Sequence, residues 1–176
     1  MVELGGRLAQ LLVAGDLVVL DGDLGAGKTT LTRGIGAGMG VRGLVTSPTF
    51  VIARRHRGAS GRPGLVHVDA YRLADGAELD DLDLDVDQED HVTVVEWGLG
   101  LAERLSPDHL VVSIRRPGES DGPDPDGPDP DGPDPDGPEP PSDVSDGAQD
   151  SLRLVQLEGH GQRWRNVDLT AAVTVA

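Results

Sequence analysis

The sequence predicts a three-layer α/β fold with a mainly parallel sheet. Three observations favour this fold class. A glycine-rich loop joins an apolar run at 17–21 to a helical stretch that reaches about residue 39. Two later apolar runs, at 65–69 and 92–97, read as interior strands. A final pair of strand-like runs, at 109–115 and 151–157, lies on either side of a long polar insertion, which predicts a C-terminal hairpin.

Length and composition predict a single domain over residues 1–176. Cysteine is absent, which excludes disulfides and thiolate metal sites. The chain has no apolar run of transmembrane length and does not open with a signal segment, so we expect a cytoplasmic protein without a membrane partner. With one Phe, one Tyr and two Trp, the core must consist of Leu, Val, Ile and Ala.

An acidic segment rich in proline and glycine, residues 117–150, dominates the net charge of −16. It holds 12 acids, no bases and ten of the 13 prolines, and a D-G-P-D-P repeat fills 121–140. Such a composition cannot bury apolar surface, so we predict a disordered loop insertion within the hairpin. The remainder has a net charge of −4, without the overall basic character of direct nucleic-acid binders.

Local patterns predict the elements of the first half of the chain. Leucines at helical spacing predict an amphipathic helix over 3–14. The helix after the glycine-rich loop carries three glycines between 34 and 38, and each costs about 1 kcal/mol relative to alanine. Close packing against a neighbouring element would explain them. A turn at 45–50, held extended by Pro48, leads into a predicted strand at 50–53.

A basic cluster follows that predicted strand. It forms either a solvated loop or a local basic patch for a protein partner or tRNA. Its members are Arg54, Arg55, His56, Arg57 and Arg62.

Residues 75–90 are acidic, with nine Asp or Glu side chains. The alternating aspartates at 81–87 resemble part of a calcium loop. Val86 stands where that loop needs glycine and Val92 where it needs glutamate, so a solvated acidic helix or loop explains the run better. Further on, we predict a short helix at 99–105 and a short helix or irregular segment at 161–176.

The glycine-rich loop carries a phosphate-binding motif. Residues Gly22–Thr29 match G-x-x-x-x-G-K-[ST] at every fixed position. The glycines let consecutive backbone N–H groups face one anion, and the helix N-terminus adds positive potential. Lys28 would reach the β- and γ-phosphates, and the Thr29 hydroxyl would hold Mg²⁺. Lys28 is the single lysine of the chain, at a position where the planar group of arginine would fit poorly. The motif predicts a P-loop NTPase fold.

Three further residues are candidates for a hydrolysis site. Glu96 follows an apolar strand, where a carboxylate linked to Mg²⁺ belongs. Thr49, in the extended turn, is placed like a threonine that responds to the γ-phosphate. Asp69 ends an interior strand, from which it could reach Mg²⁺, orient water or cap a turn.

Four separated motifs together resemble one known family. They are G-D-L-G-A-G-K-T-T at 22–30, S-P-T-F at 47–50, H-V-D-A-Y-R-L at 67–73 and V-E-W at 95–97. In this order and spacing they resemble the bacterial threonylcarbamoyladenosine biosynthesis ATPases, known as TsaE or YjeE, over about residues 4–115. The resemblance implies a small ATPase with weak intrinsic turnover. Its implied partners are TsaD and TsaB, which place a threonylcarbamoyl group on the adenosine beside the anticodon of certain tRNAs, so tRNA is an indirect partner.

The resemblance also implies roles for individual residues. The magnesium ligands would be Thr29 and Glu96, the essential aspartate Asp69 and the switch threonine Thr49. The expected catalytic set is therefore Lys28, Thr49, Asp69 and Glu96, with ATP and Mg²⁺ as cofactors. Contacts to the nucleotide are expected from Asp23, Leu24, Gly25, Ala26, Gly27, Lys28, Thr29, Thr30 and Trp97.

Two other functions stay open at this point. One is a nucleotide-gated binding module in which turnover is incidental, and the other is a small-molecule kinase. The arginines at 54–62 are the only candidates for the phosphate clamp that a kinase would need. A GTPase is disfavoured, because a chain with one lysine has no guanine-binding N-K-x-D motif.

Overall fold

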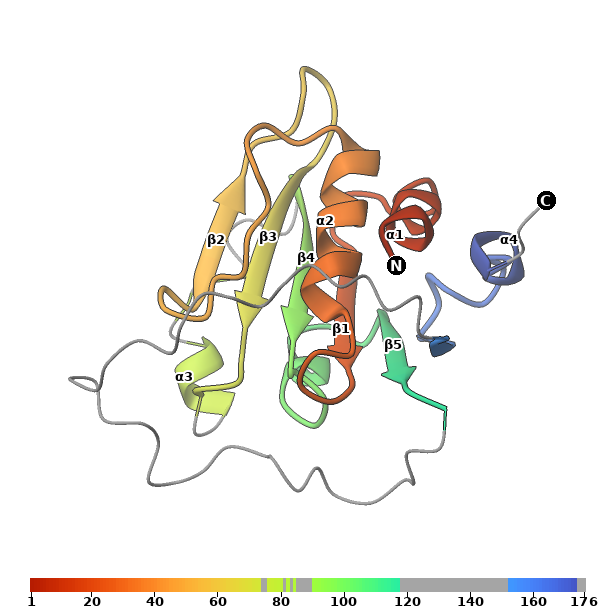
Figure 1. Ribbon diagram of the computed structural model, residues 1–176. Coiled ribbons are helices and arrows are strands. Elements are labelled where there is room, and N and C mark those ends of the chain that lie inside the picture. Colours follow the sequence, from red (N-terminus) through yellow and green to blue (C-terminus); the bar gives the residue numbers. More distant parts are fainter. Residues whose placement is uncertain (74–75, 81, 83, 85–89, 118–151, 174–176) are drawn as a thin grey trace, which may run out of the picture.

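The computed structural model describes residues 1–73, 76–80, 82, 84, 90–117 and 152–173. Within these residues the chain forms a six-stranded sheet in the order β2-β3-β4-β1-β5-β6 (Figure 1). The four central strands are mutually parallel, and the two edge strands are antiparallel to their neighbours. The central strands are β1 (Leu17–Asp21), β3 (Gly64–Asp69), β4 (His91–Glu96) and β5 (His109–Arg115), and the edges are β2 (Ala53–His56) and β6 (Leu154–His160).

Helices cover both faces of the sheet, which confirms the predicted three layers. On one face lie α1 (Val2–Leu8) and α2 (Lys28–Met39), with α4 (Thr170–Val173) beside α1. On the other lie α3 (Gly76–Asp80) and the 3₁₀ helix η2 (Ala102–Leu105).

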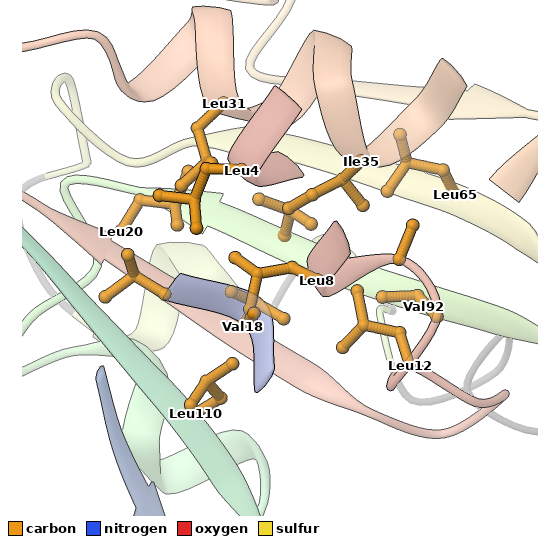
Figure 2. Close-up of a cluster of buried hydrophobic side chains, with 14 of the residues drawn as sticks. Leu4, Leu8, Leu12, Val18, Leu20, Leu31, Ile35, Leu65, Val92 and Leu110 are labelled. Atoms are coloured by element: carbon orange, nitrogen blue, oxygen red, sulfur yellow. The ribbon is translucent and has the colours of Figure 1, made fainter. Parts of the chain in front are cut away.

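Alternate residues of each central strand enter the two apolar cores, because successive side chains point to opposite faces of a sheet. Val18 and Leu20 of β1 enter the core beneath α1 and α2, whereas Leu17 and Val19 enter the core beneath α3 and η2. This is why the central strands read as continuous apolar runs. Figure 2 shows the larger core, with Leu4, Leu8, Leu12, Val18, Leu20, Leu31, Ile35, Leu65, Val92 and Leu110 labelled.

The glycines of α2 allow the close packing that the sequence predicts. A methyl group on Gly34 would collide with the carbonyl oxygen of Val2 in α1. A Cβ on Gly38 would lie 2.6 Å from the Cβ of Ala9, well inside van der Waals contact. The two helices can approach each other over the sheet because these glycines have no side chain, and the lower helix propensity of glycine is the accompanying cost.

Several predicted boundaries are wrong in instructive ways. The first helix ends at Leu8 instead of residue 14, because 3₁₀-type bonds to the Arg7 and Leu8 carbonyls replace the α-helical pattern. The predicted strand at 50–53 is a turn, closed by a bond from the Val51 N–H to the Pro48 carbonyl, and β2 begins only at Ala53.

Boundaries also shift in the C-terminal half. The helix expected at 99–105 is the 3₁₀ helix η2 over Ala102–Leu105. The last strand begins and ends three residues later than predicted, where it pairs with β5 along its whole length. This pairing confirms the C-terminal hairpin. Around the buried Trp164 the chain makes turns before the short α4, as expected for 161–176.

Two sequence predictions fall largely outside the described residues: the calcium-like run at 81–87 and the acidic insertion at 117–150. Within the described ranges, no helix has the length and apolar character needed to cross a membrane.

Candidate active site

The phosphate-binding loop connects β1 to α2 as the motif predicts. Gly25 (φ 73°) and Gly27 (φ 114°) adopt left-handed backbone conformations that are unfavourable for residues with a Cβ atom. The loop therefore turns sharply enough for α2 to begin at Lys28. The N-terminus of this twelve-residue helix points into the loop, where its positive end favours an anion.

Lys28 is folded back onto its own loop and is only 5% exposed. Its ammonium group donates hydrogen bonds to the carbonyl oxygens of Gly22 and Asp23. It also lies 3.4 Å from the centre of the Trp97 ring, a cation–π contact. Burial lowers the pKa of Lys28 to about 8, although the nearby carboxylates, Glu96 foremost, act in the opposite direction. The ammonium is held by carbonyl oxygens and a ring face.

Glu96, at the carboxyl end of β4, is the centre of a buried hydrogen-bond network. The Thr29 hydroxyl donates to its Oε2 at 2.9 Å. Its Oε1 lies 2.6 Å from the Nε2 atom of His67 and 3.3 Å from the Thr32 hydroxyl. Because α2 packs on the sheet face to which His67 and Glu96 point, two helical threonines and one strand histidine converge on a single carboxylate.

A second pair of predicted residues meets nearby. The Thr49 hydroxyl donates to Asp69 Oδ2 at 2.6 Å, and the other oxygen of Asp69 accepts the Tyr71 N–H at 3.1 Å. Asp69 thereby fastens the Ser47–Phe50 turn to the end of β3. The turn also bonds internally, through a 2.6 Å contact between the hydroxyls of Ser47 and Thr49.

Backbone strain flanks these residues. Ile52 (φ 63°) and Trp97 (φ 61°) adopt the left-handed conformation without being glycine, at a cost on the order of 1–3 kcal/mol each. The Ile52 carbonyl accepts the Asp69 N–H at 2.9 Å, and the Trp97 N–H donates to the Leu20 carbonyl at 3.0 Å. The Tyr71 ring packs at 5.1 Å from the Trp97 ring. Both strained residues therefore support the site directly.

These side chains surround a cavity of about 180 Å³ at the carboxyl ends of the central strands. Ten of the twelve predicted nucleotide and catalytic residues line it, together with Ser47. Asp23 and Ala26 do not line it: Asp23 supplies a carbonyl to Lys28, and the buried Ala26 supplies one to Arg153. The full lining is Leu24, Gly25, Gly27, Lys28, Thr29, Thr30, Ser47, Thr49, Asp69, Glu96 and Trp97.

Two members of the Glu96 network had no assigned role from the sequence. Thr32 lies one helical turn beyond Thr29, so the i, i+3 spacing was an available signal. His67 shares the strand face of Asp69, but nothing in the sequence says that its ring reaches Glu96. It is fully buried, and its Nδ1 atom has no hydrogen-bond partner among the described residues. The bond to Glu96 is thus the polar contact that this ring makes.

The oxygen atoms near the phosphate-binding loop are suitable ligands for a magnesium ion. The Thr29 hydroxyl and the Glu96 carboxylate are hard oxygen ligands within hydrogen-bond distance of each other, beside the phosphate-binding loop. Over the described part of the chain, no group of three or more His, Asp or Glu side chains could hold a metal by itself. This agrees with a cation that takes one or two protein ligands and completes its shell with phosphate and water.

Comparison with known proteins places the chain in a family. The model of the family described as "Threonylcarbamoyl adenosine biosynthesis protein TsaE" matches residues 1–121. The chain belongs to the TsaE family. A tRNA threonylcarbamoyladenosine biosynthesis protein TsaE from Streptomyces coelicolor is 51% identical to it over 171 residues, covering 97% of each chain. One from Mycobacterium tuberculosis is 58% identical over 127 residues, covering 68% of this chain and 76% of its own.

A solved structure is also similar to this chain. The crystal structure of YdiB from Bacillus subtilis is 31% identical and has a TM-score of 0.50, over 67% of this chain and 72% of that one. TsaE proteins take part in the biosynthesis of threonylcarbamoyladenosine in tRNA, as the names of the family and its members state. The family assignment confirms the resemblance carried by the four sequence motifs.

Proposed function

We propose that this chain is a magnesium-dependent ATPase that supports threonylcarbamoyl transfer to the tRNA adenosine beside the anticodon, acting with TsaD and TsaB in the cytoplasm. One observation carries the proposal. The 2.9 Å contact between the Thr29 hydroxyl and Glu96 joins the phosphate-binding loop to a strand-end carboxylate. A loop that only held an anion would not need this carboxylate. Hydrolysis of a nucleotide with a bound cation needs a carboxylate that holds the cation.

Each residue then has a definite task. Thr29 and Glu96 would hold Mg²⁺, which when bound neutralises charge on the β- and γ-phosphates. Lys28 would turn its remaining N–H from the Trp97 ring towards the phosphates. The backbone N–H groups of the loop would bind the phosphate oxygens, as the left-handed glycines allow.

Asp69 would orient the attacking water. Each of its oxygens accepts one hydrogen bond from a protein donor and keeps a second lone pair that can accept from water. Because the Thr49 hydroxyl bonds Asp69, a change in this bond when the γ-phosphate arrives would move the Ser47–Phe50 turn, the kind of local change by which nucleotide switches act.

Among the described residues that line the cavity, Lys28 is the one positively charged side chain. No arginine is among its lining residues in the described structure. Arg116 and Arg153 bond the carbonyl groups of Leu24 and Ala26 in the loop, but neither side chain is among the lining residues. Turnover by the chain alone is therefore expected to be slow, and a docked partner is expected to raise it by completing the site.

Phosphate release measured while TsaD and TsaB are titrated in tests this proposal. We expect the rate to rise, and we expect Thr49→Ala to weaken the stimulation more than it weakens ATP binding. A rate that stays flat while the complex forms would contradict coupled hydrolysis. It would favour the nucleotide-gated binding module. A variant that binds ATP without cleaving it tests that alternative directly, because such a module would keep its function in this variant. The kinase alternative loses support, because the arginines at 54–62 do not line the cavity.

A further inference from the structure

Charge is strongly segregated along this acidic chain. Residues 24–68 contain no Asp or Glu, although the whole chain has 31 of them. The same 45 residues contain seven basic side chains. They fold as α2, the edge strand β2 and the connections around them, together with most of β3 (Figure 1). One edge of the sheet is therefore positive in a protein of negative net charge.

Most arginines without a side-chain partner in the described part of the chain lie at this edge. Nine of the 14 arginines bond a carbonyl or a carboxylate, or stack on a ring, within the described residues. For the other five, the described structure gives no side-chain partner. Four of these belong to the acid-free stretch, and the fifth, Arg165, follows β6. The four, which we call the arginine edge, are Arg42, Arg54, Arg57 and Arg62.

The arginine edge gathers around the end of α2 and the β2–β3 turn. The Arg42 N–H donates to the Arg57 carbonyl at 2.8 Å, and the Arg62 guanidinium lies next to Gly40, where α2 ends. Arg57 and Arg62 line a hollow of about 540 Å³. Arg54 is exposed on β2, two residues before the last residue of that strand. Apart from the two arginines, the hollow is lined by Ala14, Gly58, Gly61, Pro63, Gly64, Asp90 and His91.

We propose that the arginine edge binds the phosphodiester backbone of RNA. Guanidinium groups pair bidentately with phosphate oxygens, and unpaired, exposed ones can do so without breaking an existing contact. At Gly61 a Cβ would meet nothing within 4 Å, so the lining leaves room there for a sugar–phosphate chain. The described residues that line the hollow include no large apolar side chain, the anchor on which protein interfaces commonly depend. The observations thus favour a nucleic-acid backbone over an acidic protein.

The overall negative charge does not oppose this binding at physiological salt. Fields from exposed charges fall off over about 8 Å at 0.15 M ionic strength. Phosphates at the arginine edge would therefore respond chiefly to the local cluster, in which Asp90 is the one acid among the described residues that line the hollow.

The surface lies at the far end of the sheet from the nucleotide cavity. The hollow adjoins Gly64 and His91, where β3 and β4 begin, and the cavity adjoins Asp69 and Glu96, where they end. ATP and RNA can therefore be bound together. The inference rests on the proposed function only in naming tRNA as the RNA, and the two can fail separately.

Binding of a labelled, unmodified tRNA transcript, followed by fluorescence anisotropy from 50 to 200 mM salt, tests the proposal. Four phosphate contacts predict a slope of about −3 for log affinity against log salt. Each Arg→Gln change at the arginine edge should reduce that slope by about one, and the fourfold variant should nearly abolish binding. Arg165→Gln, the matched control outside the cluster, should bind like the parent protein. Lys28→Ala should also bind tRNA normally, whereas the fourfold variant should retain its ATPase activity.

The opposite results would overturn the inference. One such result is tRNA binding by the parent protein that is undetectable or does not depend on salt. Another is a fourfold variant that binds tRNA with the affinity of the parent protein. Competition separates RNA from an acidic protein. Unlabelled tRNA should displace the labelled tRNA at a lower concentration than polyglutamate does, when both competitors are compared at equal numbers of negative charges. Equal displacement by polyglutamate would assign the surface to acidic polypeptides and overturn the proposal. Circular dichroism of each variant confirms that the fold is intact.

Discussion

Replacing Glu96 by glutamine tests the proposed centre of the site with almost no change in shape. The side chain is 3% exposed and its carboxylate accepts from three side chains, those of Thr29, Thr32 and His67. Glutamine turns one acceptor oxygen into an NH₂ donor and removes the negative charge. At least one of the three neighbours must then face a donor instead of an acceptor.

The structure sets the size of the effect. A hydrogen bond to a charged group contributes about 1.5–3 kcal/mol, so losing one lowers the free energy of unfolding by about that amount. This corresponds to a melting temperature lower by about 2–4 °C for each kcal/mol. His67 can relieve part of the loss by accepting from the amide through Nε2, but its Nδ1–H then stays buried without a partner. The site survives with a weaker hold on Thr29.

The larger effect is expected on catalysis. Without the carboxylate charge, we expect the Mg²⁺ concentration for half-maximal activity to rise at least about tenfold. We expect kcat to fall about 10²- to 10³-fold, as when one electrostatic contact to a transition state is removed. ATPase rates over a magnesium series, together with thermal melts, measure both. Glu158→Gln, an exposed glutamate on β6, is the matched control. Magnesium dependence and kcat within twofold of the parent protein would refute the role given to Glu96.

Four further predictions concern the same site and the insertion. Lys28→Ala should weaken ATP binding greatly, and Lys28→Arg should not restore it; near-parental affinity in a calorimetric titration of either would contradict the phosphate-loop assignment. Burial lowers the pKa of Lys28 to about 8, below its ordinary value near 10.5, so the free protein loses this positive charge above pH 8. ATP affinity without added metal should therefore fall from pH 8 to pH 9, and an unchanged affinity would argue against this. Asp69→Asn should slow hydrolysis with less effect on ATP binding; losses of affinity equal to those of Glu96→Gln would instead make Asp69 a magnesium ligand. Deleting residues 119–148, whose composition cannot form a core, should leave the melting temperature and ATPase rate nearly unchanged, and a large drop in melting temperature would show otherwise.

The boundaries that the sequence misplaced share a physical cause. The leucines after residue 8 keep helical spacing, but Leu12 reaches the core from a turn, and the Leu11 carbonyl bonds Arg163 from the far end of the chain. Phe50 and Val51 have strand propensity, yet Phe50 is 88% exposed because the turn is fastened to Asp69. In both places a tertiary contact outweighs a local preference.

The sequence by itself determined the phosphate-binding loop, its strand and its helix, because all three lie within about 25 consecutive residues and their geometry is local. It also determined that His67 and Asp69 share a strand face, since strand side chains alternate. Only the tertiary structure decided which partners these residues have. The contacts of Glu96 with Thr29 and His67 span 67 and 29 residues of sequence. They depend on the pairing register of β3 with β4 and on how α2 packs above the sheet. That four arginines have no side-chain partner among the described residues was equally hidden, because a sequence shows where charges occur but not which of them the fold pairs.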